Sequence, residues 1–254
     1  MRPAIVMPLH DPQGQVASHL NRIAPQLESL FERAYLSVTA STIRLQNRWI
    51  EQLQVARFFK VLPVADSLGT GEHFSRLFAW AVAACPAQQP LHLCYPDRVA
   101  FALETDHRAA FCADIQGLSE EDLPLIFQRS GKAWQTHPPS YRQLEQAVTV
   151  AGRARFGRSL DFAWCHLVIR AADLEGQLPC LTRPDISMVA QLVIGLADRI
   201  QTKSVDWLAW EDPFILGIEA RQLRRERESS RTETLKRLAY VIPMLSMLES
   251  NQPG

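Results

Sequence analysis

The first 95 residues alternate short apolar runs with segments of helical periodicity. The apolar runs lie at residues 4–9, 34–40, 57–64 and 91–95. Between these runs, apolar residues recur every three or four positions, as they do on one face of an amphipathic helix. Short apolar strands separated by helices are typical of a mainly parallel sheet with helices on both faces and right-handed crossovers. The pattern therefore predicts an α/β fold.

The pattern changes after Asp106, where helical segments predominate. We expect helices at residues 107–115, 141–156 and 185–200, strands at 123–130 and 204–210, and a loop at 131–140. Residues 159–172 are compatible with a helix or a strand. A charged stretch that starts at residue 218 and runs into an apolar end at 248 predicts a long C-terminal helix that packs back on the body. Without an internal repeat or linker, residues 1–254 are predicted to form one domain with halves 1–106 and 107–254.

Charge and hydropathy exclude several broad classes of partner. Lys and Arg together number 27, as do Asp and Glu, so the formal net charge is zero and gives no reason to expect nucleic acid or an anionic membrane. The most apolar late run, residues 186–197, contains Ser187 and Gln191 and is shorter than the ~20 residues that span a bilayer. The five cysteines form no Cys-x-x-Cys pair, so they predict reduced thiols and no zinc site. We expect a soluble, cytoplasmic protein without a signal peptide.

An acidic residue follows the fourth apolar run. Tyr95-Pro96-Asp97 comes directly after that predicted strand, and ligands of open α/β sheets bind at the carboxyl ends of the strands. A carboxylate there can hold a hard divalent cation, which in turn can hold a diphosphate. Asp97 can equally cap the next helix, and both interpretations are open on the residues alone.

A glycine-containing loop, residues 67–71, precedes the predicted helix at 72–85. Free N–H groups at a helix N-terminus attract phosphate. The loop has neither the Gly-Lys-Ser/Thr of a Walker loop nor a Gly-x-Gly-x-x-Gly fingerprint. An ordinary strand-to-helix turn is the simpler interpretation.

Two adjacent acids, Glu211 and Asp212, follow the predicted strand at 204–210, next to Trp210 and Pro213. A carboxylate in such a place can serve as the general base for a hydroxyl nucleophile. The alternative is a surface turn with Trp207 and Trp210 in the core.

In their chain order, these segments resemble a nucleotide-sugar glycosyltransferase of the GT-A type. The matching stretches are AIVMPLHDP, VTAS, SLGTGEHFSRLFAW and LHLCYPD. The resemblance implies a GT-A-like, Rossmann-like fold with a mixed, mainly parallel sheet, and binding of UDP or a UDP-sugar together with Mn2+ or Mg2+. In that family a short Asp-x-Asp motif holds the metal. Here Tyr95-Pro96-Asp97 takes its place, so the first acid is missing and Asp97 is the one predicted metal ligand.

The stretches YPDRVAFALETDHRAAF and VDWLAWEDPF look closer to the majastridin group, glycosyltransferase-like proteins encoded among ATP synthase genes. The two resemblances together imply a nucleotide-binding half, 1–106, and an acceptor half, 107–254. They place the following residues at the nucleotide and metal: Pro8, His10, Thr39, Ser41, Leu68, Gly69, His73, Tyr95 and Asp97. They make Asp212 or Glu211 the catalytic base of an inverting transfer to an unknown acceptor.

Two other functions are compatible with the sequence. The missing first acid favours a non-catalytic module that binds a uridine nucleotide without turning it over. The charged C-terminal segment, residues 218–248, favours a module that binds a protein partner. A likeness of fold cannot decide among the three.

Overall fold

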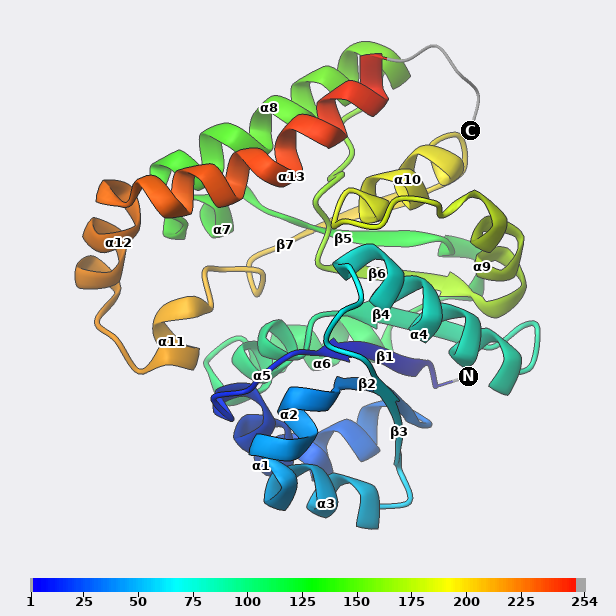
Figure 1. The fold of residues 1–254 in the computed structure, drawn as a ribbon. Coiled ribbons are helices and arrows are strands. Elements are labelled where there is room, and N and C mark those ends of the chain that lie inside the picture. Colours follow the sequence, from blue (N-terminus) through cyan, green and yellow to red (C-terminus); the bar gives the residue numbers. More distant parts are fainter. Residues whose placement is uncertain (1, 250–254) are drawn as a thin grey trace.

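The computed structural model describes residues 2–249, and these contain one seven-stranded sheet (Figure 1). Its strands, in chain order, are β1 (Ala4–Leu9), β2 (Ala34–Thr39), β3 (Phe59–Val64), β4 (Pro90–Cys94), β5 (Leu125–Arg129), β6 (His166–Arg170) and β7 (Gln201–Val205). Their order across the sheet is β3-β2-β1-β4-β6-β5-β7.

Helices fill the connections between the strands. The α-helices are α1 (Gln15–Leu30), α2 (Ala40–Leu45), α3 (Asn47–Val55), α4 (Thr70–Ala84), α5 (Pro96–Glu104), α6 (Arg108–Gln116), α7 (Gly131–Thr136), α8 (Pro139–Phe156), α9 (Ala171–Gln177), α10 (Met188–Leu196), α11 (Asp212–Leu216), α12 (Ala220–Ser229) and α13 (Arg231–Glu249). Two short 3-10 helices are η1 (Glu120–Asp122) and η2 (Leu178–Cys180).

One strand reverses the direction of an otherwise parallel sheet. β1 pairs in parallel with β2 and β4, and β2 with β3. β6 runs antiparallel to both β4 and β5, while β7 is parallel to β5. The β4–β6 pairing is therefore where the strands of the first half meet those of the second. The predicted mixed, mainly parallel sheet flanked by helices is confirmed.

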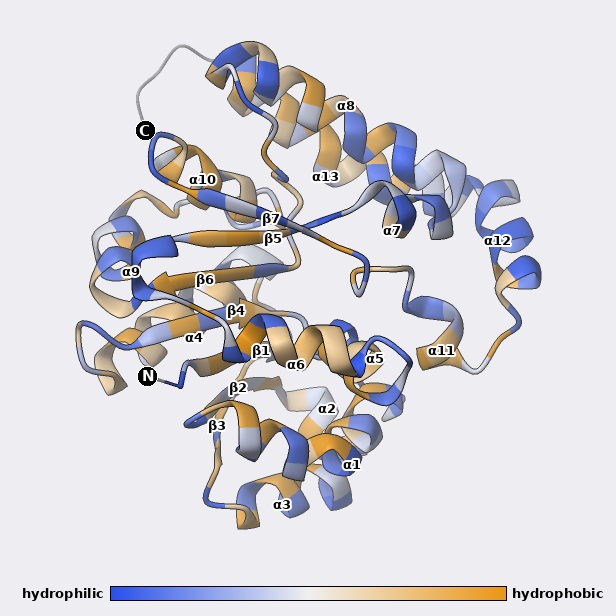
Figure 2. Cartoon of the chain, turned by 180° about the vertical axis from the view of Figure 1, so that it is seen from behind, coloured by the Kyte–Doolittle hydropathy of each residue, from blue (hydrophilic) through white to orange (hydrophobic). Residues whose placement is uncertain are grey.

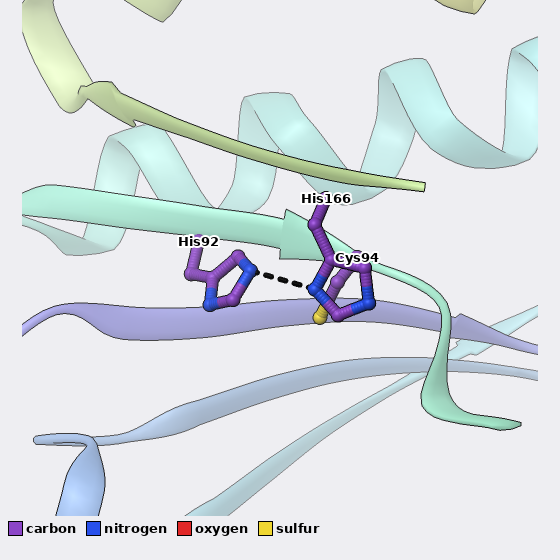
Figure 3. Close-up of side chains that lie close together, drawn as sticks. All are labelled: His92, Cys94 and His166. Atoms are coloured by element: carbon purple, nitrogen blue, oxygen red, sulfur yellow. Dashed lines mark hydrogen bonds between the residues drawn. The ribbon is translucent and has the colours of Figure 1, made fainter. Parts of the chain in front are cut away.

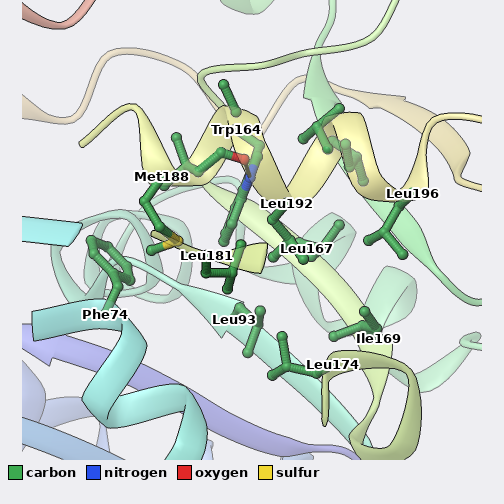
Figure 4. Close-up of a cluster of buried hydrophobic side chains, with 14 of the residues drawn as sticks. Phe74, Leu93, Trp164, Leu167, Ile169, Leu174, Leu181, Met188, Leu192 and Leu196 are labelled. Carbon is green, nitrogen blue, oxygen red and sulfur yellow. Dashed lines mark hydrogen bonds between the residues drawn. The ribbon is translucent and has the colours of Figure 1, made fainter. Parts of the chain in front are cut away.

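Apolar side chains cover both faces of the sheet, because neighbouring residues of a strand point to opposite sides. In β1, Ala4 and Val6 pack with α4 and α10, whereas Ile5 and Met7 pack with α1 and α5. Figure 4 shows the first cluster, in which side chains of β4, β6, α4, α9 and α10 meet. Viewed from behind, Figure 2 shows many hydrophilic residues along α8 and α12.

The C-terminal helix α13 lies along α8, and the two cross one end of the sheet (Figure 1). Val148 of α8 and four residues of α13 are buried in the first cluster: Val241, Met244, Met247 and Leu248. The expected C-terminal helical segment is thus present and packs on the body. It is divided in two, because Ser230 has an extended backbone and its hydroxyl accepts a hydrogen bond from the Glu233 N–H, which starts a new helix.

Two further expectations about local structure were wrong. The loop predicted at residues 131–140 contains α7, which Ser130 caps by accepting a hydrogen bond from Ala133 N. The strand predicted at residues 204–210 is shifted: β7 ends at Val205, and Trp207 and Trp210 are buried in the irregular segment after it. β7 is an edge strand with largely exposed, polar residues, so its sequence lacks the apolar signal of a central strand.

Within residues 2–249, no helix is both long enough and apolar enough to cross a membrane.

Gly152 provides a test of the packing between α8 and the segment before β6. A Cβ atom at Gly152 would overlap the ring of Phe162, which is fully buried and cannot move aside. We expect Gly152→Ala to lower the free energy of unfolding by about 1–3 kcal/mol, the usual effect of overpacking. Urea denaturation measures this change. The matched control is Gly176→Ala in α9, where an added Cβ meets no atom within 4 Å. That variant should be neutral or more stable by about 0.5 kcal/mol, because alanine favours a helix. Equal effects of the two substitutions would contradict the packing described.

Candidate functional site

A cavity of about 410 Å³, here called the strand-end cavity, lies at the carboxyl ends of β1, β2 and β4. Seven of the nine residues predicted at the nucleotide line it: Pro8, His10, Thr39, Leu68, His73, Tyr95 and Asp97. They come from four separate segments of the first half. The topology brings them together because parallel strands present their carboxyl ends at one edge of the sheet.

Polar side chains at the end of β2 form a connected group. Thr39 Oγ1 lies 3.0 Å from His10 Nδ1 and 2.9 Å from Thr42 Oγ1. Ser41, the eighth predicted residue, is not among the lining residues. It lies beside them, since its hydroxyl and N–H both donate to Asp66, at 2.6 and 3.0 Å. Thr39 and Asp66 line the cavity, so this group offers hydrogen-bond partners to a polar ligand.

The N-terminus of α4 is already satisfied by protein groups. The Glu72 carboxylate accepts a hydrogen bond from Gly69 N at 3.0 Å, and the Pro184 carbonyl accepts one from Gly71 N at 2.8 Å. A Cβ at either glycine would overlap the backbone of residues 183–185. The two glycines are thus explained by close backbone packing. Of this loop, Leu68 and Thr70 line the cavity, while Gly69, the ninth predicted residue, lies between them.

His73 is buried in the wall of the strand-end cavity, and its Nε2 lies 2.7 Å from the Ser37 hydroxyl. Burial lowers the pKa of His73, so the ring is neutral at physiological pH. A neutral imidazole at this place can exchange hydrogen bonds with a ligand without adding positive charge.

Asp97 and Tyr95 line both the strand-end cavity and a second cavity. Tyr95 is the N-cap of α5, and Asp97 belongs to the first turn of that helix. The negative charge suits a helix N-terminus, and Asp97 Oδ1 accepts a hydrogen bond from the Arg98 N–H in the same turn at 2.9 Å. Burial raises the pKa of Asp97, and Arg98 counteracts this rise. The Tyr95 ring packs edge-on against Phe74, with centroids 5.5 Å apart.

The second cavity, here called the arginine cavity, measures about 240 Å³. Arg98, Arg129 and Arg237 line it, and each is paired with a carboxylate. Arg129 donates to Glu145 at 2.6 Å, and Arg237 donates to the same carboxylate at 2.8 Å. Against the effect of burial, these two arginines lower the pKa of Glu145 to about 2, so it is ionised at neutral pH.

Glu211 lines the arginine cavity and forms an ion pair with Arg98. It is 5% exposed, and burial raises its pKa to about 8; Arg98 opposes the rise, whereas Asp212 and Asp97 add to it. A carboxylate with a pKa of about 8 is a stronger base than an ordinary one, and the fraction of it that is deprotonated at physiological pH can accept a proton from a hydroxyl group. Among the two predicted base residues, the geometry therefore favours Glu211.

Asp212 has a different environment from its neighbour. It is the first residue of α11, it does not line either cavity, and its carboxylate pairs with Arg227 of α12 at 3.2 Å. This ion pair holds α12 beside α11. Both acids follow a bend and not a strand, which corrects the local structure expected for them.

Sequence reasoning missed most of the wall of the arginine cavity. Arg98, Glu145, Arg237 and Tyr240 lie at single positions on helices α5, α8 and α13. Their local sequence does not distinguish them from polar or charged residues that are exposed on a helix face, because only the tertiary structure buries them. Arg129, at the end of β5, lies over the Trp134 ring at 3.8 Å.

The residues present fit a metal site that a substrate completes. Asp97 is the one predicted ligand, and within residues 2–249 no group of three His, Cys, Asp or Glu side chains with converging ligand atoms includes it. Mg2+ in proteins is often held by one or two carboxylates together with substrate phosphates. Asp97 lines the strand-end cavity and would be the carboxylate in such a site.

No protein-family model matches the chain, and no curated protein matches it in sequence. Solved structures do match it. Glucosyl-3-phosphoglycerate synthase from Mycobacterium tuberculosis, in complex with UDP, superimposes with a TM-score of 0.52 at 14% identity, over 96% of this chain and 80% of that one. The complex of that enzyme with Mn2+, UDP-glucose and phosphoglyceric acid gives the same TM-score, identity and coverage. Its complex with Mn2+, UDP and phosphoglyceric acid matches with a TM-score of 0.50 at 16% identity, over 94% of this chain and 78% of that one. These similarities confirm that the chain has a GT-A-like glycosyltransferase fold.

Proposed function

We propose that the chain binds a UDP-sugar in the strand-end cavity and transfers the sugar to a hydroxyl group of an acceptor in the arginine cavity. The observation that carries the proposal is that Tyr95 and Asp97 line both cavities, while Glu211 lines the arginine cavity. A donor whose diphosphate reaches Asp97 would present its sugar to the arginine cavity. The closer resemblance to the majastridin group stays a prediction.

On the donor side, Asp97 would hold Mn2+ or Mg2+ against the diphosphate. Such a cation, when bound, offsets negative charge on the departing UDP. The hydroxyl groups of Thr39 and Ser41 offer polar contacts for the nucleoside, together with His10. His73 is neutral and adds a further hydrogen-bonding group without repelling the cation.

On the acceptor side, Glu211 would take the proton from the attacking hydroxyl group. In a single displacement, the acceptor oxygen forms a bond to the anomeric carbon while the bond from that carbon to the diphosphate breaks. The proton goes to the Glu211 carboxylate and UDP leaves, so the configuration of the sugar is inverted. The ion pair with Arg98 fixes the position of the carboxylate.

A second function, nucleotide binding without transfer, is favoured by the surroundings of Tyr95 and Asp97. Tyr95 occupies the position of the missing first acid and packs against Phe74, so the metal site has one carboxylate where the family has two. A chain that binds UDP weakly through a single carboxylate, without transfer, would be a nucleotide-binding module. Binding with no release of UDP from any donor sugar would support this second function.

We expect Asp97→Asn to remove the metal dependence of nucleotide binding. Calorimetric titration of UDP with Mn2+ present should show a loss of affinity of about tenfold or more, ~1.4 kcal/mol, for the variant. Chelator should weaken binding to the unmodified chain and leave the variant unchanged. Asp106→Asn, at an exposed acid outside both cavities, is the matched control and should retain chelator sensitivity. Equal affinities of the Asp97 variant and the unmodified chain with Mn2+ would remove Asp97 from the site.

We expect Glu211→Gln to abolish transfer while UDP affinity is retained. Loss of a general base lowers turnover by about 10²–10⁴-fold. Release of UDP from a panel of UDP-sugars, with water as the acceptor, measures this turnover without knowledge of the natural acceptor. Circular dichroism should accompany the assay, because Arg98 loses its charged partner. Asp212→Asn should retain most of the turnover. A larger loss of turnover in this variant than in Glu211→Gln would show that Asp212 is the base.

The pH dependence of turnover should report the same group. The Glu211 carboxylate is active when deprotonated, and its pKa is about 8. Turnover should therefore rise as the pH increases from 6, reach half of its maximum near pH 8 and level off above about pH 9. A flat profile between pH 6 and 9 at saturating donor would contradict a base with this pKa.

A further inference from the structure

A second group of chemically active side chains lies in the core, away from both cavities. His92 and Cys94 belong to β4, and His166 stands opposite Cys94 on β6. Alternate residues of a strand point to one face, so all three share a side of the sheet. One ligand atom of each lies within 4.8 Å of those of the other two, and this is the one such group within residues 2–249. Figure 3 shows Cys94 reaching toward the paired rings.

The hydrogen bonding of the two imidazoles is incomplete. His92 Nε2 and His166 Nδ1 lie 2.9 Å apart, whereas His92 Nδ1 and His166 Nε2 are buried without a partner. Two neutral rings carry two N–H groups, and one of these can lie in the shared bond. The other lacks an acceptor in either tautomer. Such a group costs about 1–3 kcal/mol, so the stability of the core does not by itself explain why the two rings lie here.

The surroundings of the cluster are apolar and aromatic. The His166 ring meets Trp207 nearly edge-on at 4.9 Å and 78°, and the His92 ring lies 5.6 Å from Phe31. Aromatic faces accept N–H groups only weakly. The cluster includes no carboxylate that would balance an excess positive charge.

We propose that His92, Cys94 and His166 form a buried, three-coordinate site for a soft monovalent cation, Cu+. Thiolate and imidazole are ligands that Cu+ accepts. Cu+ with one thiolate and two neutral imidazoles makes a complex of zero net charge, which an apolar core tolerates. Zn2+ with the same ligands would leave one positive charge buried, at a high cost, and its structural sites use four ligands.

The two imidazoles are already in the neutral form that binds a cation, whereas the Cys94 thiol must lose its proton. Burial lowers the pKa of His92 to about 3 and that of His166 far below its usual range, so both rings are neutral at physiological pH. Burial raises the pKa of the Cys94 thiol. A bound cation displaces that proton, as metals do with coordinating thiols.

The location gives the site a structural consequence. The β4–β6 pairing is the one contact between strands of the two halves, and Cys94 directly precedes Tyr95. A cation held by both strands would join the halves immediately before the residues shared by the two cavities. This inference is independent of the proposed transfer reaction.

The test begins with the exposed thiol of Cys180, which binds copper adventitiously and is therefore replaced in all samples by Cys180→Ser. The chain is produced in cells grown with added copper, purified without oxygen and passed over a Cu+ chelator. Elemental analysis should find about one copper per chain. X-ray absorption should find one sulfur and two imidazole nitrogens around Cu+, a measurement that needs no further substitution.

Cys94→Ser and His166→Asn should each lower the retained copper at least tenfold, whereas Cys85→Ser, at a half-buried thiol elsewhere, should retain it. The copper-loaded chain should also melt at a higher temperature than the metal-free chain. Absence of retained copper, two or more sulfur ligands, or equal retention by the Cys94 variant would overturn the site. Retention of Zn2+ in preference to Cu+ would overturn its assignment to a monovalent cation.

Discussion

The second half of the molecule depends on one buried arginine. Arg129, at the end of β5, pairs with Glu145 of α8 and with Asp161 of the segment before β6, at 2.6 and 3.0 Å. Glu145 in turn accepts hydrogen bonds from Arg237 and Tyr240 of α13, both at 2.8 Å. Removal of one partner from a buried ionic group costs about 3–5 kcal/mol, because it leaves a charge without compensation. The network therefore fixes α8 and α13 to the sheet and closes the arginine cavity.

Much of the first half could be predicted from local patterns. The runs at residues 4–9, 34–40 and 91–95 were apolar because both faces of each strand are covered, and they correspond to β1, β2 and β4. The predictions failed where the local amino-acid composition of a segment does not match its position in the tertiary structure. β7 is polar because it lies at an edge, and the apolar residues after it are buried without forming a strand. The break at Ser230 depends on one capping hydroxyl within a long helical pattern.

The candidate site divides in the same way. Strand ends are predictable positions, so His10, Thr39 and Asp97 could be placed on one edge before any coordinates were known. Glu145 and Arg237 could not, since each is a charged residue on a helix and becomes part of a cavity only through contacts between elements distant in sequence. The His92–Cys94–His166 cluster was equally hidden, because an antiparallel pairing of β4 with β6 brings residues 74 positions apart into contact.

The shared walls of the two cavities have a thermodynamic consequence. Tyr95 and Asp97 belong to both cavities, so a ligand in one changes the charge and shape that a ligand in the other meets. If the first ligand changes the affinity of the second by some factor, the second ligand must change the affinity of the first by the same factor, because the binding free energies form a closed cycle. The affinity of either cavity is therefore not a fixed property of that cavity. It is a function of the concentration of whatever occupies its neighbour.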